Sequence, residues 1–164
     1  MSDASEAASA LIQVLAERHQ TVSVAESLTG GALTAMLTGP PGASAVVRGG
    51  LVVYATDTKA TIAGVDESLL ARVGPVDVAV ASQLAAGVRA RFDSTYGIGI
   101  TGVAGPLEQD GHPVGEVHIG VAGPGGVVTA SPDFGALADR AAIRQASAKA
   151  AMELLARALR EADR

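Results

Sequence analysis

Hydrophobic residues follow two periods along the chain, and each change of period marks a boundary between a helix and a strand. At the start, Ala8, Leu11, Ile12 and Leu15 recur at helical spacing with charged residues on the other face, which predicts a helix over 4–19. Helical spacing or an alanine-rich composition predicts further helices, at 29 to about 37, near 57–64, at 66–72, at 77–92 and from 137 to about 162. Aliphatic runs bounded by turn residues predict strands, at 21–26, 46–54, 95–101, about 114–122 and 126–132.

The order of these elements indicates an α/β fold. Helices and strands alternate along most of the chain, and the last two strands flank the segment 123–126 (Gly-Pro-Gly-Gly), which is typical of a hairpin turn. The aliphatic runs around Val52 and Ile98 are typical of strands covered on both faces. With 164 residues, 48% of them hydrophobic, and no linker or repeat, the chain predicts a single domain over 1–164, a three-layer α/β/α sandwich with a mixed sheet.

Composition argues against several classes of function. The net charge is −5, whereas nucleic-acid binding needs a basic surface. The chain has no cysteine, no apolar run of about 18 residues and a polar, acidic start, so we expect a cytoplasmic protein that does not bind membranes. The histidines, His19, His112 and His118, lack metal-ligand spacing, so we expect neither a metal nor a cofactor.

The use of lysine points to a candidate catalytic group. The chain has ten arginines and only two lysines, and one of these, Lys59, lies 32 residues after Ser27. Lysine can lose its proton in a desolvated pocket, whereas arginine effectively never does. A neutral amine can activate a serine hydroxyl for attack, so Lys59 is either the base that activates Ser27 or a solvated surface lysine.

Two glycine-containing loops follow predicted strands and carry a hydroxyl residue. One runs from Ser27 to Gly31 and the other from Thr101 to Pro106. Ligands of open α/β sheets bind beyond the carboxyl ends of the strands, and glycine lets backbone amides approach them. The alternative is that both loops are tight turns without a ligand. The binding hypothesis makes candidates of residues in and next to these loops, namely Glu26, Thr29, Gly30, Gly31, Thr101, Gly102 and Gly105.

Charged and aromatic residues elsewhere add further candidates. Arg140 and Arg144 open the last predicted helix and either bind a phosphate or carboxylate or lie exposed on the surface. Tyr54, at the end of a predicted strand, is either a ligand contact or part of the core.

The chain contains a series of short motifs that is specific when taken together. The series consists of Ala25-Glu26-Ser27-Leu28-Thr29-Gly30-Gly31, Pro41-Gly42-Ala43-Ser44, Gly50-Leu51-Val52-Val53-Tyr54 with Lys59, Thr101-Gly102-Val103-Ala104-Gly105-Pro106, Pro113-Val114-Gly115, and Asp139-Arg140 with Arg144. In that order it resembles the CinA C-terminal domain family, whose characterised members are nicotinamide-nucleotide amidases. The resemblance covers residues 5–160 and points to a stand-alone form, without the N-terminal nucleotide-pyrophosphatase domain that many relatives carry.

The resemblance implies an activity and a set of roles. The activity is hydrolysis of the carboxamide of nicotinamide mononucleotide (NMN) to nicotinate mononucleotide and ammonia, without a metal. Ser27 matches the nucleophile and Lys59 the base. Tyr54, Thr101 and Arg140 match residues that line the site, and Ser44 matches the serine of the family's Pro-Gly-x-Ser motif. The resemblance also implies an α/β/α sandwich and a homodimer.

The chain departs from the family pattern near these positions, so other functions stay open. Leu28 stands where relatives often have Cys, Ala55-Thr56 replaces a Ser-Asn pair, 75–77 (Pro-Val-Asp) replaces a frequent Ala-Val-Ser, and 106–111 (Pro-Leu-Glu-Gln-Asp-Gly) replaces a common Pro-Asp-Gly-Gly. The first hypothesis is therefore an NMN amidase. The others are a nucleotide-binding module without catalysis and a serine/lysine hydrolase of a different amide.

Overall fold

The protein is built around one mixed five-stranded sheet. The computed structural model describes residues 3–137 and 139–163. The strands are β1 (Val22–Glu26), β2 (Val47–Val52), β3 (Tyr96–Gly102), β4 (Val117–Gly123) and β5 (Gly126–Ala130), in the order β2-β1-β3-β4-β5. β1 runs parallel to both β2 and β3, whereas β3–β4 and β4–β5 are antiparallel. The mixed sheet predicted from the sequence is confirmed.

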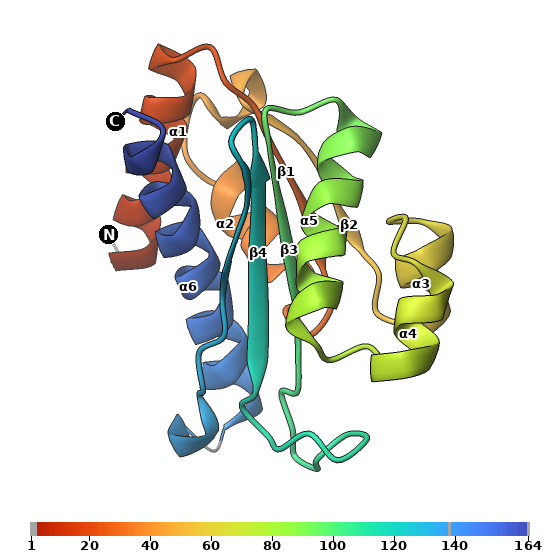
Figure 1. Ribbon diagram of the computed structural model, residues 1–164. Helices are drawn as coiled ribbons and strands as arrows, with labels where there is room; N and C mark the ends of the chain where they lie inside the picture. The colour runs from red at the N-terminus through yellow and green to blue at the C-terminus, as the bar shows by residue number, and fades with distance from the viewer. Residues whose placement is uncertain (1–2, 138, 164) are drawn as a thin grey trace.

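Helices cover both faces of this sheet. They are α1 (Asp3–Glu17), α2 (Ala32–Thr38), α3 (Thr56–Thr61), α4 (Glu67–Val73), α5 (Val78–Phe92) and α6 (Arg140–Glu161), with short 3₁₀ turns at Ala43–Ala45 and Gly135–Leu137. α1, α2 and α6 lie on one side of the sheet and α3, α4 and α5 on the other (Figure 1). The predicted three-layer α/β/α sandwich is therefore confirmed. Within the described residues, no helix is both long and apolar enough to span a bilayer.

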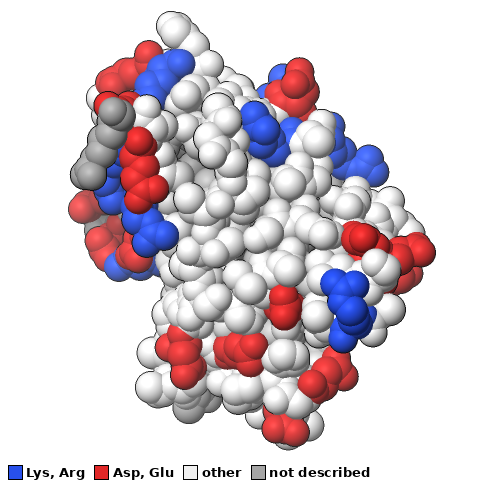
Figure 2. Space-filling model, viewed as in Figure 1, with Lys and Arg blue, Asp and Glu red and all other residues white. Residues whose placement is uncertain are grey.

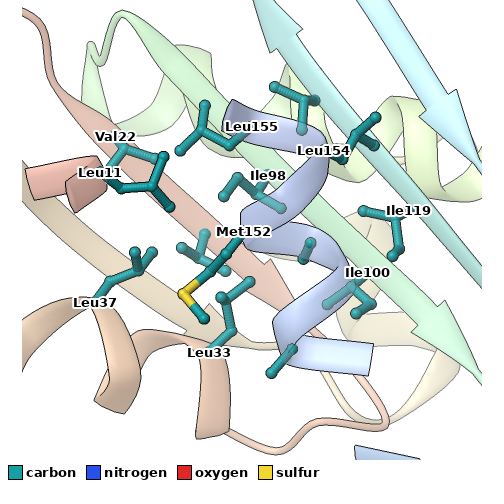
Figure 3. Packing of buried hydrophobic residues seen from close by; sticks show 14 of the residues in the cluster. Leu11, Val22, Leu33, Leu37, Ile98, Ile100, Ile119, Met152, Leu154 and Leu155 are labelled. Atoms are coloured by element: carbon teal, nitrogen blue, oxygen red, sulfur yellow. The ribbon is translucent and has the colours of Figure 1, made fainter. Parts of the chain in front are cut away.

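Two apolar clusters fill the spaces between the layers. The larger joins α1, α2 and α6 to the sheet, and Met152 of α6 contributes to it beside Leu33 and Ile98 (Figure 3). The smaller includes Leu84 of α5 and Val53. Aliphatic side chains dominate both clusters, as the 2% of aromatic residues in the sequence requires.

Glycines in β3 bring α5 unusually close to the sheet. A Cβ on Gly97 would lie 2.2 Å from the Ala85 carbonyl oxygen, and one on Gly99 would lie 2.4 Å from that of Ala81. No side chain fits at either position, because real Cβ atoms do not approach other atoms so closely. This packing fixes the carboxyl end of β3, where Thr101 stands, relative to the loop that leads into α5.

Three predicted starts are wrong by three residues, and the structure gives a reason for each. The second helix starts at Ala32 rather than 29, because Gly30 and Gly31 have φ values of +59° and +101°. β4 starts at Val117 rather than near 114, since the Gly115 amide instead donates to the Val103 carbonyl at 2.8 Å. The last helix starts at Arg140 rather than 137. Asp139 caps the helix at this point, because its carboxylate accepts a hydrogen bond from the Ala142 amide at 2.8 Å. Residue 138 lies outside the described residues.

Candidate active site

Ser27 stands at the carboxyl end of β1, at the start of a sharp turn into α2. Its amide donates to the Ile100 carbonyl of β3 at 3.0 Å, and its carbonyl accepts from the Gly30 amide at 3.1 Å. The left-handed backbone of Gly30 and Gly31 completes the turn. The backbone on both sides of Ser27 is thus fixed by the sheet and the turn, and the residue is 7% exposed.

Lys59 of α3 meets Ser27 inside the protein. Its Nζ lies 2.9 Å from Ser27 Oγ, 2.8 Å from the Val53 carbonyl oxygen and 3.2 Å from that of Tyr54. The residue is only 1% exposed, so the alternative of a solvated surface lysine is wrong. α3 follows β2 after a short loop, and this connection places the lysine beside the end of the neighbouring strand β1.

These contacts are compatible with both protonation states of the lysine. A charged ammonium has three N–H donors, one for each of the three oxygens. Burial lowers the pKa of Lys59 from 10.5 to about 8. A neutral amine has two N–H donors and one lone pair. Because the two carbonyl oxygens can only accept, they take the two N–H groups, and the lone pair is left to accept the Ser27 hydroxyl proton. With Lys59 neutral, the distance between the two groups allows the Ser27 proton to pass to the lysine amine.

The pair lies in a pocket with a buried floor and an exposed rim. The pocket encloses about 120 Å³. Its floor includes Ser27, Leu28, Lys59, Pro75, Val76, Thr101, Val103 and Ala104. Its rim consists of the exposed residues Tyr54, Leu107, Gln109 and Arg140. Gly102 and Gly105 also line it, so the loop after β3 forms one wall, as its position at the end of a strand predicts.

Three of the predicted site residues support the walls. The Thr101 hydroxyl donates to the Pro75 carbonyl at 2.7 Å and so ties β3 to the loop before α5. Arg140 Nη1 donates to the Gly105 carbonyl, and its Nη2 donates to the Tyr54 hydroxyl at 3.2 Å. Arg140 is therefore a positive charge on the rim that also holds two other rim segments together.

Glu26 belongs to the fold rather than to the pocket. Its buried carboxylate accepts hydrogen bonds from the Leu33 amide at 2.9 Å, the Thr34 amide at 3.0 Å and the Thr34 hydroxyl at 2.6 Å. These amides form the amino terminus of α2. A carboxylate already occupies the place where a substrate phosphate would bind to this helix.

Arg144 contacts the loop after Ser27 and does not line the pocket. Its Nε donates to the Leu28 carbonyl at 3.1 Å and its Nη2 to the Thr29 carbonyl at 3.0 Å. The guanidinium passes so close to Gly30 that a Cβ there would lie 2.9 Å from it. The loop residues Thr29, Gly30 and Gly31 thus shape the turn and are absent from the pocket wall.

Ser44 lies away from the other candidates. It is exposed in the 3₁₀ turn that precedes β2, at the amino end of that strand. Ser27 follows the carboxyl end of β1, and β1 and β2 are parallel, so the two serines lie at opposite ends of the sheet. The structure does not bring Ser44 to the pocket.

The pocket-lining residues to which sequence reasoning gave no role include Leu28, Pro75, Val76, Leu107 and Gln109. In the sequence they stand out only as departures from a family pattern or as parts of such departures. Pro75 has one further signal, because it lies just before the predicted helix at 77–92 and therefore in a connection between elements.

The fold and the pocket define an α/β/α domain with a buried serine–lysine pair at the carboxyl ends of its parallel strands. The sequence matches the CinA C-terminal domain over residues 4–159, and the chain belongs to this family. It is 50% identical over 149 residues to a CinA-like protein of Frankia casuarinae, covering 91% of this chain and 34% of that protein. It is 46% identical over 159 residues to a CinA-like protein of Cyanothece, covering 96% of this chain and 38% of that protein. The chain thus spans about a third of the length of these curated relatives.

Solved structures show the same fold over nearly the whole chain. The competence/damage inducible protein CihA from Agrobacterium tumefaciens is 34% identical with a TM-score of 0.92, over 98% of this chain and 97% of that one. A competence-damaged protein (CinA) superfamily protein from Escherichia coli is 29% identical with a TM-score of 0.88, over 94% of this chain and 91% of that one.

Proposed function

We propose that this protein hydrolyses the carboxamide of NMN to nicotinate mononucleotide and ammonia. The observation that carries the proposal is the 2.9 Å contact between Lys59 Nζ and Ser27 Oγ in a buried site open to a pocket. The substrate comes from the family resemblance, and the reaction type is supported by the geometry of the pair.

The reaction proceeds in two halves. In the first, Ser27 Oγ bonds to the carboxamide carbon while its proton passes to the lone pair of Lys59. Lys59 then gives that proton to the amide nitrogen, the C–N bond breaks, and ammonia leaves an ester on Ser27. In the second half, a water molecule loses its proton to Lys59 and attacks the ester, and Ser27 leaves with that proton. General-base catalysis of this kind contributes on the order of 10²–10⁴ in rate.

When Ser27 attacks, the carboxamide oxygen becomes a negatively charged oxyanion. It needs backbone N–H donors that make no other hydrogen bond. In the loop after β1, the Gly30 amide already donates to the Ser27 carbonyl at 3.1 Å. In a trans peptide the carbonyl and the following N–H point in opposite directions, so this bond turns the Leu28 amide away from Gly30. Leu28 lines the pocket, and its amide is our candidate donor. In the second loop the Val103 amide already donates to the Glu116 carbonyl at 2.9 Å, and we take the Ala104 and Gly105 amides as candidate donors there.

The size of the pocket fits only part of a nucleotide. Its 120 Å³ has room for the reactive amide and its ring, and the sugar and phosphate then lie at the rim. Among the lining residues, Arg140 is the charged group at the rim, and its guanidinium suits phosphate oxygens. Because Glu26 occupies the amino terminus of α2, we assign the phosphate to Arg140.

An ammonia-release assay with a set of amides tests the proposal. The purified chain is incubated with NMN, nicotinamide riboside, nicotinamide and glutamine, and the pyridine products are identified by mass. We expect ammonia and nicotinate mononucleotide from NMN, and far lower rates with the other amides. Ammonia from another amide alone would favour a different serine/lysine hydrolase. Binding of NMN without any ammonia would favour a nucleotide-binding module.

The homodimer and the cytoplasmic location also remain proposals, the first based on the resemblance and the second on composition. Static light scattering of the purified chain tests the first, with twice the mass of 16.3 kDa as the expected result. A single-chain mass at micromolar concentration would contradict it.

A further inference from the structure

The rim of the pocket carries a polar side chain, Gln109, that has no role in the proposed reaction. Of the four exposed rim residues, Arg140 bonds to the Gly105 carbonyl and to the Tyr54 hydroxyl, while Leu107 is apolar. The Gln109 side-chain amide makes no hydrogen bond to any residue that the structure describes. Gln109 thus lines the exposed rim with its side-chain donors and acceptor available.

A tight hairpin fixes the backbone of Gln109. The Gln109 amide donates to the His112 carbonyl at 3.1 Å, and the His112 amide donates to the Gln109 carbonyl at 2.8 Å. Between them, Asp110 and Gly111 have φ values of +50° and +81°, the pattern of a type I′ turn. The start of the Gln109 side chain is thus held in one place.

A cluster of ionisable groups, Glu116 with His112 and His118, anchors this hairpin to the sheet. Glu116 Oε1 lies 3.0 Å from His112 Nδ1 and 2.8 Å from His118 Nε2, and His118 stands on β4. Partial burial would raise the pKa of Glu116, but the hydrogen bonds from the two imidazoles and their charge lower it overall. The Glu116 carboxylate is therefore ionised at neutral pH and binds the hairpin to a strand of the core.

The chemistry around Gln109 indicates which part of a ligand it contacts. Its neighbours Glu108 and Asp110 are acidic and exposed, and Figure 2 shows mostly acidic side chains at the lower end of the visible face, where the loop after β3 lies in Figure 1. Such a loop repels a phosphate, which Arg140 attracts to another part of the rim. An uncharged amide that both donates and accepts matches hydroxyl groups, which do the same.

We propose that Gln109 is a specificity-determining residue that hydrogen-bonds to the sugar hydroxyls of the nucleotide. The proposal rests on the proposed function, because it takes the reactive amide to lie at Ser27 and the phosphate at Arg140. Since the hairpin holds the backbone of the glutamine before the ligand arrives, little conformational entropy is lost on binding. Gln109 thereby distinguishes a ribonucleotide from an amide that lacks the sugar.

The test compares NMN with its analogue that lacks the 2′- and 3′-hydroxyl groups. In the Gln109→Ala variant, KM for NMN rises about tenfold, the effect of one or two hydrogen bonds, while kcat changes less than about twofold. With the dideoxy analogue, the same variant behaves like the wild type. Glu108→Gln, on the same loop but outside the pocket lining, is the matched control and leaves KM for both within about twofold. An equal rise in KM for the two substrates, or no rise in KM for NMN, would overturn the proposal.

Calorimetric binding to the Ser27→Ala variant separates this proposal from the function on which it rests. If the wild type releases no ammonia but Gln109→Ala still weakens binding of NMN and not of the analogue, the hydrolase proposal fails and the role of Gln109 stands. If NMN does not bind at all, both are overturned.

Discussion

Replacing Lys59 by methionine tests whether this lysine is buried at a cost to stability. Methionine keeps an unbranched, flexible chain of similar length and removes the ionisable amine. It also leaves the Val53 and Tyr54 carbonyls without their donor, which lowers stability by an amount that does not depend on pH. The informative quantity is therefore how the stability difference between wild type and variant changes with pH.

The sign and size of this change in the stability difference follow from the pKa of Lys59. Burial lowers this pKa to about 8 in the folded protein, whereas the unfolded chain keeps the ordinary lysine value of 10.5. Below pH 8 both states bind the proton, and the folded state carries the full penalty of a buried charge. Between these two pKa values the unfolded chain binds more protons, so wild-type stability rises with pH. At about 1.4 kcal/mol for each pKa unit, the wild type gains about 2–3 kcal/mol over the variant from pH 7 to pH 10.

Urea unfolding at several pH values measures this gain. Wild type, Lys59→Met and Lys149→Met are unfolded at pH 7, 8.5 and 10, and their free energies of unfolding are compared. Lys149 is the control, because it is the only other lysine and its pKa is raised by an exposed contact with Asp3. The reasoning is refuted if the Lys59→Met and wild-type stabilities run parallel over this range.

Three further predictions concern the reaction itself. Because only neutral Lys59 acts as base, kcat/KM for NMN should rise about tenfold per pH unit below a midpoint near pH 8 and then level off; a flat profile would contradict this. Arg140→Ala should raise KM for NMN roughly 30-fold, since it removes about 2 kcal/mol of charged hydrogen bonding, and should change nicotinamide riboside hydrolysis little. Equal effects of the substitution on NMN and nicotinamide riboside hydrolysis would show instead that Arg140 acts by supporting the Gly105 loop. Arg144→Lys should lower kcat about tenfold without changing KM, because it loosens the turn after Ser27; a change in KM alone would place it in substrate binding.

The fold was predictable because its signals are local. Each aliphatic run became a strand, and the hairpin near 123–126 followed from its glycines. One boundary failed because a contact from elsewhere in the chain decides the backbone. The Gly115 amide bonds to Val103 in the preceding loop, so β4 starts later than its sequence pattern predicts.

The site was predictable in part, for reasons that differ between residues. Successive side chains of a strand point to opposite faces, which is why Glu26 binds α2 while Ser27 meets Lys59. Arg140 and Arg144 are one helical turn apart on the same face of α6, so spacing alone could not say which reaches the pocket. Gln109 was missed because its place at the rim depends on a hairpin anchored through Glu116 to β4.

The most direct test of the account is the initial rate of ammonia release from NMN by wild type and by Ser27→Ala. The two proteins are compared at equal concentration. Circular dichroism shows whether the variant is folded, and a binding measurement shows whether it still binds NMN. The account predicts a loss on the order of 10³ or more in kcat, because the nucleophile is gone while the pocket remains. Lys59→Arg, which keeps a charge but cannot accept the serine proton, should lose a comparable factor. A Ser27→Ala variant that binds NMN and still releases ammonia at more than a few per cent of the wild-type rate would contradict the account.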